Sequence, residues 1–264
     1  MPWLATAEVA LRYDLQGDGP ETLLLLHEMG GSLESWDAIL PLLLPRFRVL
    51  RHDQRGAGMS ERPPGPLGMA AAGRDAVALL DALGIAGPVV PVGTAVGGAV
   101  ALHLAASFPD RVRAVVATSP ATGVPPEARP ALEDRAAALA REGTRSVVDA
   151  GLDQGWPPVL RTDPARFAAT RAQRLGASAE GWAATMRMLA GLDMQAELDR
   201  IRCPALILAG AHDLTRPPAR VAPVAAAIPG SIFRTVESGH FMALQTPELL
   251  AAEITRFLDA GAAR

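Results

Sequence analysis

The chain has 264 residues, with 25 arginine and lysine side chains against 28 aspartates and glutamates, so its formal charge is −3. This near-neutral balance argues against electrostatic binding to nucleic acid or to a membrane surface. Hydrophobic residues make up 49% of the chain, which excludes a disordered protein, and no apolar run approaches the roughly 20 residues of a membrane helix. We expect one domain, or one domain with a large insertion.

Residues 1–8 and the cysteine content both indicate a protein of the cytoplasm. Residues 1–8 lack the basic and apolar regions of a signal peptide, and the single Cys203 cannot form an internal disulfide. We therefore expect a cytoplasmic monomer or homodimer that acts on a small-molecule substrate, without cofactor, metal, nucleic acid or membrane.

Short apolar runs alternate with segments of helical periodicity in the first half of the chain. The pattern predicts strands at residues 8–15, 22–27, 47–53, 89–93 and 112–118, with helices at 69–83 and 96–108. Such alternation is typical of the α/β class with a doubly wound, mostly parallel sheet. Pro91 conflicts with a central strand because it cannot donate to the ladder, so we expect a bulge or an early strand end there.

The pattern changes at residue 120. Residues 120–199 contain helical stretches broken by proline and glycine but no good strand, and they are too many for a structureless loop. Strands resume at residues 204–209 and 232–236, and a helix at 247–258 closes the chain. We predict an α/β core from residues 1–119 and 200–264, with residues 120–199 inserted as a helical cap.

One stretch between a predicted strand and a predicted helix carries the chemical signal: Gly93-Thr94-Ala95-Val96-Gly97-Gly98. In a nucleophile elbow, Gly-x-Ser-x-Gly, the chain turns so sharply that the central side chain projects above the sheet, and the flanking glycines avoid collisions. Gly93 and Gly97 stand where those glycines belong. The projecting residue, Ala95, is an alanine and not a serine.

Three further motifs accompany the elbow: residues 53–60 (DQRGAGMS), 210–213 (GAHD) and 238–240 (SGH). With them the chain resembles α/β-hydrolase-fold enzymes, most of all the 3-oxoadipate enol-lactonase-like branch. The resemblance covers nearly the whole chain and implies a nucleophile–acid–base triad at Ala95, Asp213 and His240. A serine needs such an imidazole to take its proton, and the imidazole needs a carboxylate to fix its tautomer.

The resemblance also implies an oxyanion hole made by the backbone N–H groups of Val96 and Met29. In the loop that holds Met29, Glu28 replaces the glycine usual in the family. We expect its carboxylate either to touch the substrate or to be solvated.

The substrate pocket is predicted less sharply. Arginines of the cap are candidates for pairing with a substrate carboxylate, although most are expected on solvated helix faces: Arg161, Arg166, Arg171 and Arg187. The candidate pocket residues are His27, Glu28, Trp36, Ser119, Trp156, Trp182 and Phe241.

The resemblance implies a serine-type hydrolase (EC 3.1.1-like) of a small carboxylic ester or lactone, here in an inactive form. Loss of a triad serine costs about a million-fold in turnover. We favour an engineered Ser-to-Ala replacement, since every other part of the machinery is in place. The alternatives are an amide, formyl or carbon–carbon bond hydrolase of an aromatic degradation pathway and, in another class, a non-catalytic ligand-binding pseudoenzyme that naturally lacks the nucleophile.

Overall fold

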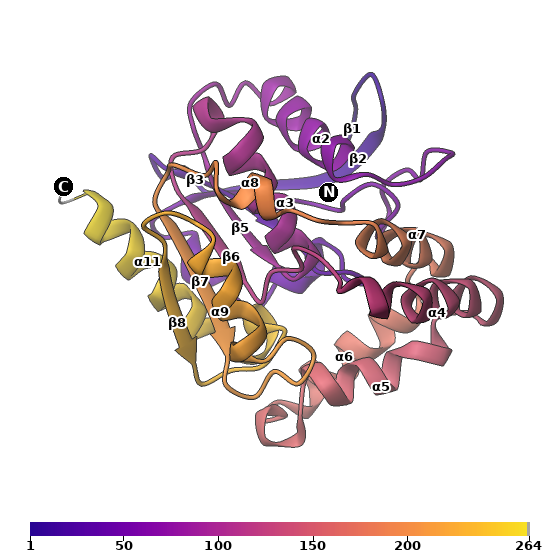
Figure 1. The fold of residues 1–264 in the computed structure, drawn as a ribbon. Helices are drawn as coiled ribbons and strands as arrows, with labels where there is room; N and C mark the ends of the chain where they lie inside the picture. The colour runs from indigo at the N-terminus through magenta and orange to yellow at the C-terminus, as the bar shows by residue number, and fades with distance from the viewer. Residues whose placement is uncertain (263–264) are drawn as a thin grey trace.

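A computed structural model describes residues 1–262 of the chain. Eight strands form one sheet in the order β1-β2-β4-β3-β5-β6-β7-β8 (Figure 1). β2 runs antiparallel to its neighbours β1 and β4, and every other pair is parallel. The predicted α/β class with a doubly wound, mostly parallel sheet is confirmed.

The strands are short, and most match the predicted ranges to within two residues. Four elements were not predicted, the edge strand β1 and the helices α1, α9 and α10, and β6 is shorter than expected. The strands are β1 (Trp3–Ala5), β2 (Ala10–Gln16), β3 (Thr22–Leu26), β4 (Arg48–His52), β5 (Val90–Thr94), β6 (Val115–Thr118), β7 (Ala205–Gly210) and β8 (Ile232–Val236). The α-helices are α1 (Leu40–Leu43), α2 (Met69–Ala82), α3 (Val96–Ser107), α4 (Arg129–Glu142), α5 (Arg145–Gly155), α6 (Pro164–Leu175), α7 (Ala179–Ala190), α8 (Gln195–Leu198), α9 (Pro218–Ala226), α10 (Met242–Gln245) and α11 (Pro247–Ala262).

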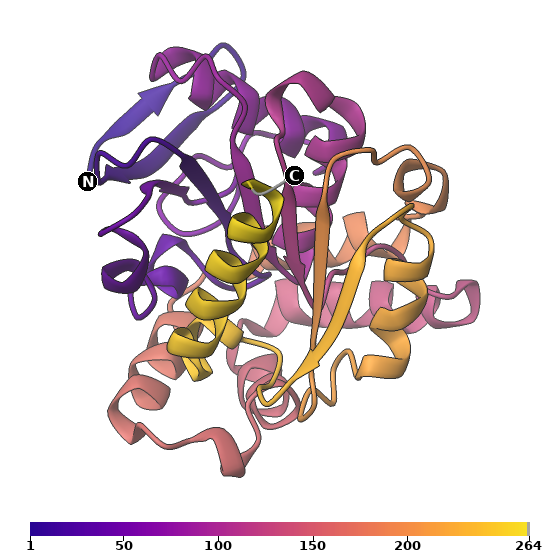
Figure 2. The ribbon, with the colours of Figure 1, turned by 90° about the vertical axis from the view of Figure 1, so that its left-hand side faces the viewer.

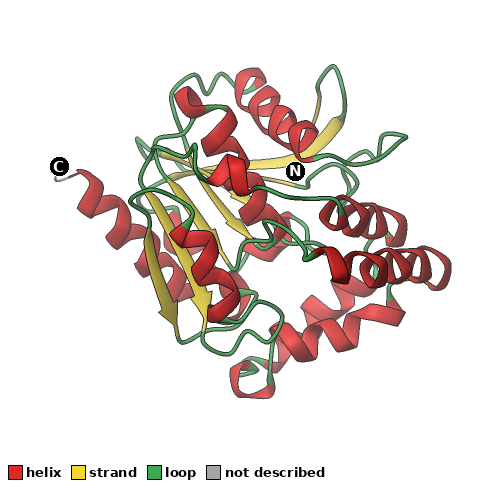
Figure 3. Ribbon diagram, viewed as in Figure 1, coloured by secondary structure: helices red, strands yellow, loops and turns green. Residues whose placement is uncertain are grey.

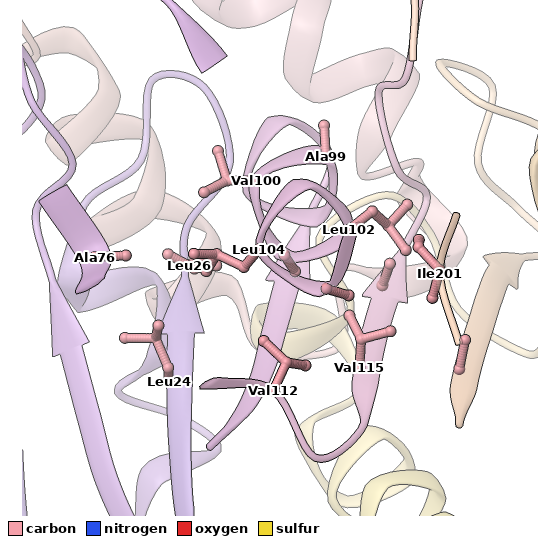
Figure 4. Packing of buried hydrophobic residues seen from close by; sticks show 14 of the residues in the cluster. Leu24, Leu26, Ala76, Ala99, Val100, Leu102, Leu104, Val112, Val115 and Ile201 are labelled. Atoms are coloured by element: carbon pink, nitrogen blue, oxygen red, sulfur yellow. The ribbon is translucent and has the colours of Figure 1, made fainter. Parts of the chain in front are cut away.

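Helices cover both faces of the sheet, and the side-chain alternation of β3 shows how. Leu24 and Leu26 pack into the cluster formed with α2, α3 and α9, as the close view in Figure 4 shows for α3. Leu23 and Leu25 point to the other face, toward α1 and α11. Figure 2 shows α11 lying across that second face. Because both faces are buried, the strand is apolar throughout and not alternating.

Pro91 lies inside β5, opposite Leu24 of β3. On the other side of β5, the pairing shifts by one residue, from Val89 opposite Val112 to Val92 opposite Val116. One extra residue of the partner segment therefore faces Pro91, which is the arrangement of a β-bulge. The missing N–H of the proline thus falls where the ladder is already interrupted.

Between β6 and β7 the chain forms a group of helices with no strand among them (Figure 3). Helices α4 to α7 lie beyond the carboxyl ends of the central strands (Figure 1). A single antiparallel bridge between Gly123 and Asp193 joins the two connections to the sheet. We refer to residues 120–199 as the cap below. No helix of the described residues is long and apolar enough to span a membrane.

Candidate active site

The elbow is a sharp turn between β5 and α3. Ala95 stands between them with a φ of 53°, and Ser119 is the other non-glycine residue with positive φ among residues 1–262. A Cβ at Gly93 would overlap the carbonyl oxygen of Gly97, and one at Gly97 would overlap that of Leu26. Only glycines fit at these two positions, so the turn is held tightly and the side chain of residue 95 projects from it.

The residues predicted as acid and base, Asp213 and His240, come from the loops that follow β7 and β8. His240 Nδ1 lies 2.7 Å from Asp213 Oδ2, and both residues are buried. Asp213 Oδ1 accepts the backbone N–H groups of Thr215 and Arg216, each at 2.8 Å. The carboxylate thus holds the proton on Nδ1, which leaves the lone pair of Nε2 available on the cavity side.

The electrostatics of Asp213 keep it ionised. Burial raises its pKa, but the hydrogen bond and charge of His240 and the N–H of Arg216 outweigh burial, so the pKa lies below its ordinary value. The Ser119 hydroxyl adds to this lowering, although it is buried and makes no hydrogen bond of good geometry.

A cavity of about 520 Å³ lies between the elbow and the cap. Met29, Ala95, Val96 and His240 all line it. Val96 is the first residue of α3, so its N–H has no acceptor within the helix. The N–H of Met29 likewise donates to no group of the described residues. Two free amides and one imidazole therefore belong to residues that line the same cavity as Ala95.

The structure divides the remaining pocket candidates. Glu28, Trp182 and Phe241 line this cavity, whereas His27 lines only an adjoining one of about 40 Å³.

Three pocket predictions are wrong. Trp36 is buried against the opposite face of the sheet, because its helical turn packs with α1 and α11. Trp156 is buried in the core of the cap, where its Nε1–H donates to Leu160. Ser119 is fully buried beside Asp213 and does not reach the cavity.

Glu28 is not solvated, contrary to one of its two expected roles. It is buried and forms an ion pair with Arg174, a residue of α6 that the sequence did not single out. The unusual glutamate in the loop was the one signal in the sequence that pointed to an arginine partner, because a buried carboxylate requires a cationic group beside it.

The four cap arginines singled out from the sequence lie outside the cavity. Arg161, Arg166 and Arg171 instead pair with aspartates of the cap. The arginines that do line the cavity are Arg135, Arg174, Arg216 and Arg220. Burial, together with the charge of Arg220, lowers the pKa of Arg216 to about 10, so its guanidinium is charged at neutral pH. Among residues 1–262 no group of three His, Cys, Asp or Glu side chains is placed to hold a metal ion.

Comparison with known proteins agrees with this geometry. The family described as alpha/beta hydrolase fold matches residues 21–188, about two thirds of the chain. The chain belongs to this family. Its relatives include "Putative carbamate hydrolase RutD" of Caulobacter sp. strain K31, with 31% identity over 92% of both chains. The 3-oxoadipate enol-lactonase 2 of Acinetobacter baylyi is 29% identical over 93% of this chain and 91% of its own.

Solved structures support the same assignment. The enol-lactonase from Burkholderia xenovorans LB400 superposes with a TM-score of 0.91 at 28% identity, covering 98% of this chain and all of its own. A hydrolase from Pseudomonas aeruginosa PA01 gives a TM-score of 0.90 at 32% identity, covering 97% of both chains. The resemblance to the enol-lactonase-like branch is thus confirmed, and the four proteins named here are hydrolases or lactonases by name.

Proposed function

We propose that the chain binds a small carboxylic ester or lactone in the cavity above Ala95, at a site laid out for hydrolysis by a nucleophile–His–Asp triad. The observation that carries the proposal is the single cavity shared by Ala95, His240 and the free amides of Met29 and Val96. Asp213, bonded to His240 from behind, completes the set.

The chemistry of such a site depends on the atom at position 95. With a serine there, Oγ attacks the acyl carbon while His240 Nε2 takes its proton, and the two amides stabilise the oxyanion. His240 returns the proton to the leaving oxygen, and water then cleaves the acyl-enzyme by the same steps. A methyl group has no electron pair to donate, so Ala95 closes this covalent route. The loss corresponds to about a million-fold in turnover, or roughly 8 kcal/mol.

A second candidate function needs no nucleophilic side chain. His240 Nε2 takes a proton from a water molecule, the water oxygen attacks the carbonyl directly, and the same amides bind the oxyanion. The C–N bond then breaks as the carbonyl re-forms, and His240 returns the proton to the leaving nitrogen. The similarity to proteins named as carbamate hydrolases favours a carbamate or another C–N bond as the substrate for this route. A formyl or carbon–carbon bond substrate remains an alternative for the triad, and ligand binding without catalysis remains the alternative of another class.

The charge of the cavity supports an anionic substrate. Arg135, Arg174, Arg216 and Arg220 line it against the single carboxylate of Glu28, although the chain as a whole is acidic. Because Glu28 is already paired with Arg174, at least Arg216 and Arg220 lack an acidic side chain along the cavity wall. A substrate carboxylate would supply that partner.

The decisive experiment restores the hydroxyl. Ala95→Ser should create hydrolysis of small esters and lactones, at least a thousand-fold above the Ala95 chain. Ala99→Ser, which places the same group one turn further along α3 in the core, is the matched control and should stay at the Ala95 level. Hydrolysis that stays at that level in Ala95→Ser as well refutes the triad proposal.

The codon at position 95 of the natural gene shows whether the alanine was introduced. A serine codon at position 95 supports an introduced replacement, whereas an alanine codon favours the water route or simple binding. His240→Asn separates these two: it should abolish slow carbamate hydrolysis by the Ala95 chain if water attacks directly, and should change nothing if the cavity only binds.

A further inference from the structure

Arg174 is the one cap side chain that joins the cap to the oxyanion loop, residues 27–32, by a buried ion pair. It extends from α6, and its guanidinium pairs with the carboxylate of Glu28, 146 positions earlier in the chain. Both side chains are at least nine-tenths buried. Ser35 Oγ donates to the same carboxylate oxygen at 3.1 Å, so Glu28 is held from the core as well as from the cap.

The same guanidinium touches both halves of the candidate machinery. Arg174 Nη1 donates to the carbonyl oxygen of Met29 at 3.4 Å. Its central carbon lies 4.2 Å from the ring centroid of Phe241, and that ring packs edge-to-face on His240 at 5.0 Å. Arg174 thus contacts the residue that carries the oxyanion donor and the residue that follows the base.

The direction of the Met29 N–H is set by the opposite end of its own peptide. The carbonyl of Glu28 accepts the N–H of Gly31 at 3.0 Å and the Nδ1–H of His27 at 2.8 Å. The proton of His27 is on Nδ1 because its Nε2 accepts the backbone N–H of Gln54. In a trans peptide the C=O and N–H point in opposite directions, so a carbonyl held toward the core leaves the Met29 N–H toward the cavity.

Other contacts tie this loop to the seated cap. Gln173, next to Arg174 on α6, hydrogen-bonds to Ser32. Gly30 has a φ of 75°, and the ring of Trp182 on α7 leaves no room for a Cβ there. The loop therefore has cap residues against it at Glu28, Gly30 and Ser32.

From these contacts we infer that Arg174 is a positioning residue for the oxyanion site. The hydrogen bonds of the Glu28 carbonyl orient the 28–29 peptide from the core, and Arg174 fixes the groups on either side of that peptide, the Glu28 side chain and the Met29 carbonyl, from the cap. Both sets of contacts are needed to present the Met29 N–H, so the oxyanion site is complete only while α6 is seated on the core. This inference rests on the proposed hydrolase function for its catalytic consequence, but the orientation of the peptide can be measured without catalysis.

The test removes the pair without leaving a buried charge. Breaking one partner alone leaves an uncompensated ion and risks unfolding, so the variant is the neutral double replacement Glu28→Gln with Arg174→Met. In the Ala95→Ser background we expect kcat to fall about 100-fold, the cost of one oxyanion donor, with KM changed by less than about threefold. Arg174→Lys with native Glu28 keeps the charge and should recover part of the loss.

A matched pair on the same helix is the control. Arg171 and Asp149 form an exposed ion pair between α6 and α5, with Nε and Oδ1 2.6 Å apart. Asp149→Asn with Arg171→Met should leave kcat and KM unchanged. A role confined to fastening the cap predicts instead a lower unfolding temperature with kcat intact below it, and that result overturns the inference.

The orientation of the 28–29 peptide in the Ala95 chain decides the case if Ala95→Ser proves inactive. A crystal structure of the neutral double replacement should show this peptide turned so that the Met29 N–H no longer points into the cavity, whereas the Val96 N–H, held by α3, should keep its direction. An unturned peptide refutes the inference, whatever becomes of the hydrolase proposal.

Discussion

The sheet core and the cap meet at one cavity but are built differently. β3, β5 and β7 are buried at every residue, and the elbow glycines have no space for a methyl group. In the cap, Thr170 and Arg174 are the only buried residues of α6. Many ion pairs of the cap are exposed, among them the pair of Arg171 with Asp149. The core therefore provides the fixed geometry that reacting groups need, whereas the cap shapes and charges the space in front of them. Arg174 joins the two regions by a buried ion pair with Glu28.

This division predicts that equal chemical changes have unequal effects in the two regions. The largest difference concerns the acid. In the Ala95→Ser background, Asp213→Asn should lower kcat about 10⁴-fold, since an amide does not hold the Nδ1–H tautomer of His240. This equals roughly 5.4 kcal/mol of transition-state stabilisation. The same replacement in the cap, Asp149→Asn, should have no measurable effect on steady-state hydrolysis. Comparable losses in both would abolish the distinction.

The next effect is on folding. Gly97→Ala places a methyl group against the backbone carbonyls of Leu26 and His27, which cannot move aside as a flexible side chain can. Overpacking costs about 1–3 kcal/mol and occasionally more, and we expect the upper end, about 3 kcal/mol, in the free energy of unfolding from urea titration. A stability equal to that of the parent chain would mean that the elbow is looser than its geometry indicates.

We expect the free energy of unfolding to fall at acidic pH because of His52 on β4. Burial, with a smaller contribution from the charge of His27, lowers the pKa of His52 from 6.5 to about 3. Below pH 6.5 the unfolded chain binds a proton here that the folded chain does not, so this stability is present above pH 6.5 and is lost as the pH falls toward 3. The slope approaches about 1.4 kcal/mol per pH unit below pH 6.5, and the loss is roughly 2.3 kcal/mol between pH 6.5 and 4.5.

Two variants check that slope by urea titration at several pH values. His52→Gln should flatten the dependence, whereas His212→Gln, at a partly exposed site, should keep it. Residues 120–199 contain no histidine. The cap therefore adds no histidine titration of its own in this pH range.

The smallest expected effect is a gain in folding stability from a substitution in the cap. Gly151 lies inside α5, and a Cβ built there meets nothing within 4 Å. Gly151→Ala should therefore stabilise the fold by roughly 0.5–1 kcal/mol through the better helix propensity of alanine. The unfolding temperature measures it. A loss here, of the size expected for Gly97→Ala, would show that the cap is packed as tightly as the core.

Local patterns were sufficient for the strands that position the site. They predicted β3, β5, β7 and β8, and parallel strands place their carboxyl ends at one edge of the sheet. The choice of Ala95, Asp213 and His240 came from the resemblance to the family, and the position of each of them after such a strand explains why they lie at the same edge. The irregularity at Pro91 was also predicted from the local sequence. The proline required an interruption of the ladder, and a bulge lies beside it.

The sequence by itself determined the strands and the tight turn at Ala95, because periodicity and turn glycines act over a few residues. It did not determine which face of a cap helix meets the core. Arg171 and Arg174 are one turn apart on α6, yet one is exposed and the other is buried against Glu28. Trp36 is a large aromatic residue of the kind that lines pockets, but it packs on the face of the sheet that α1 and α11 cover. Only the tertiary structure decides these cases, because burial and charge pairing depend on atoms outside the local segment, as far as 146 positions away for Arg174 and Glu28.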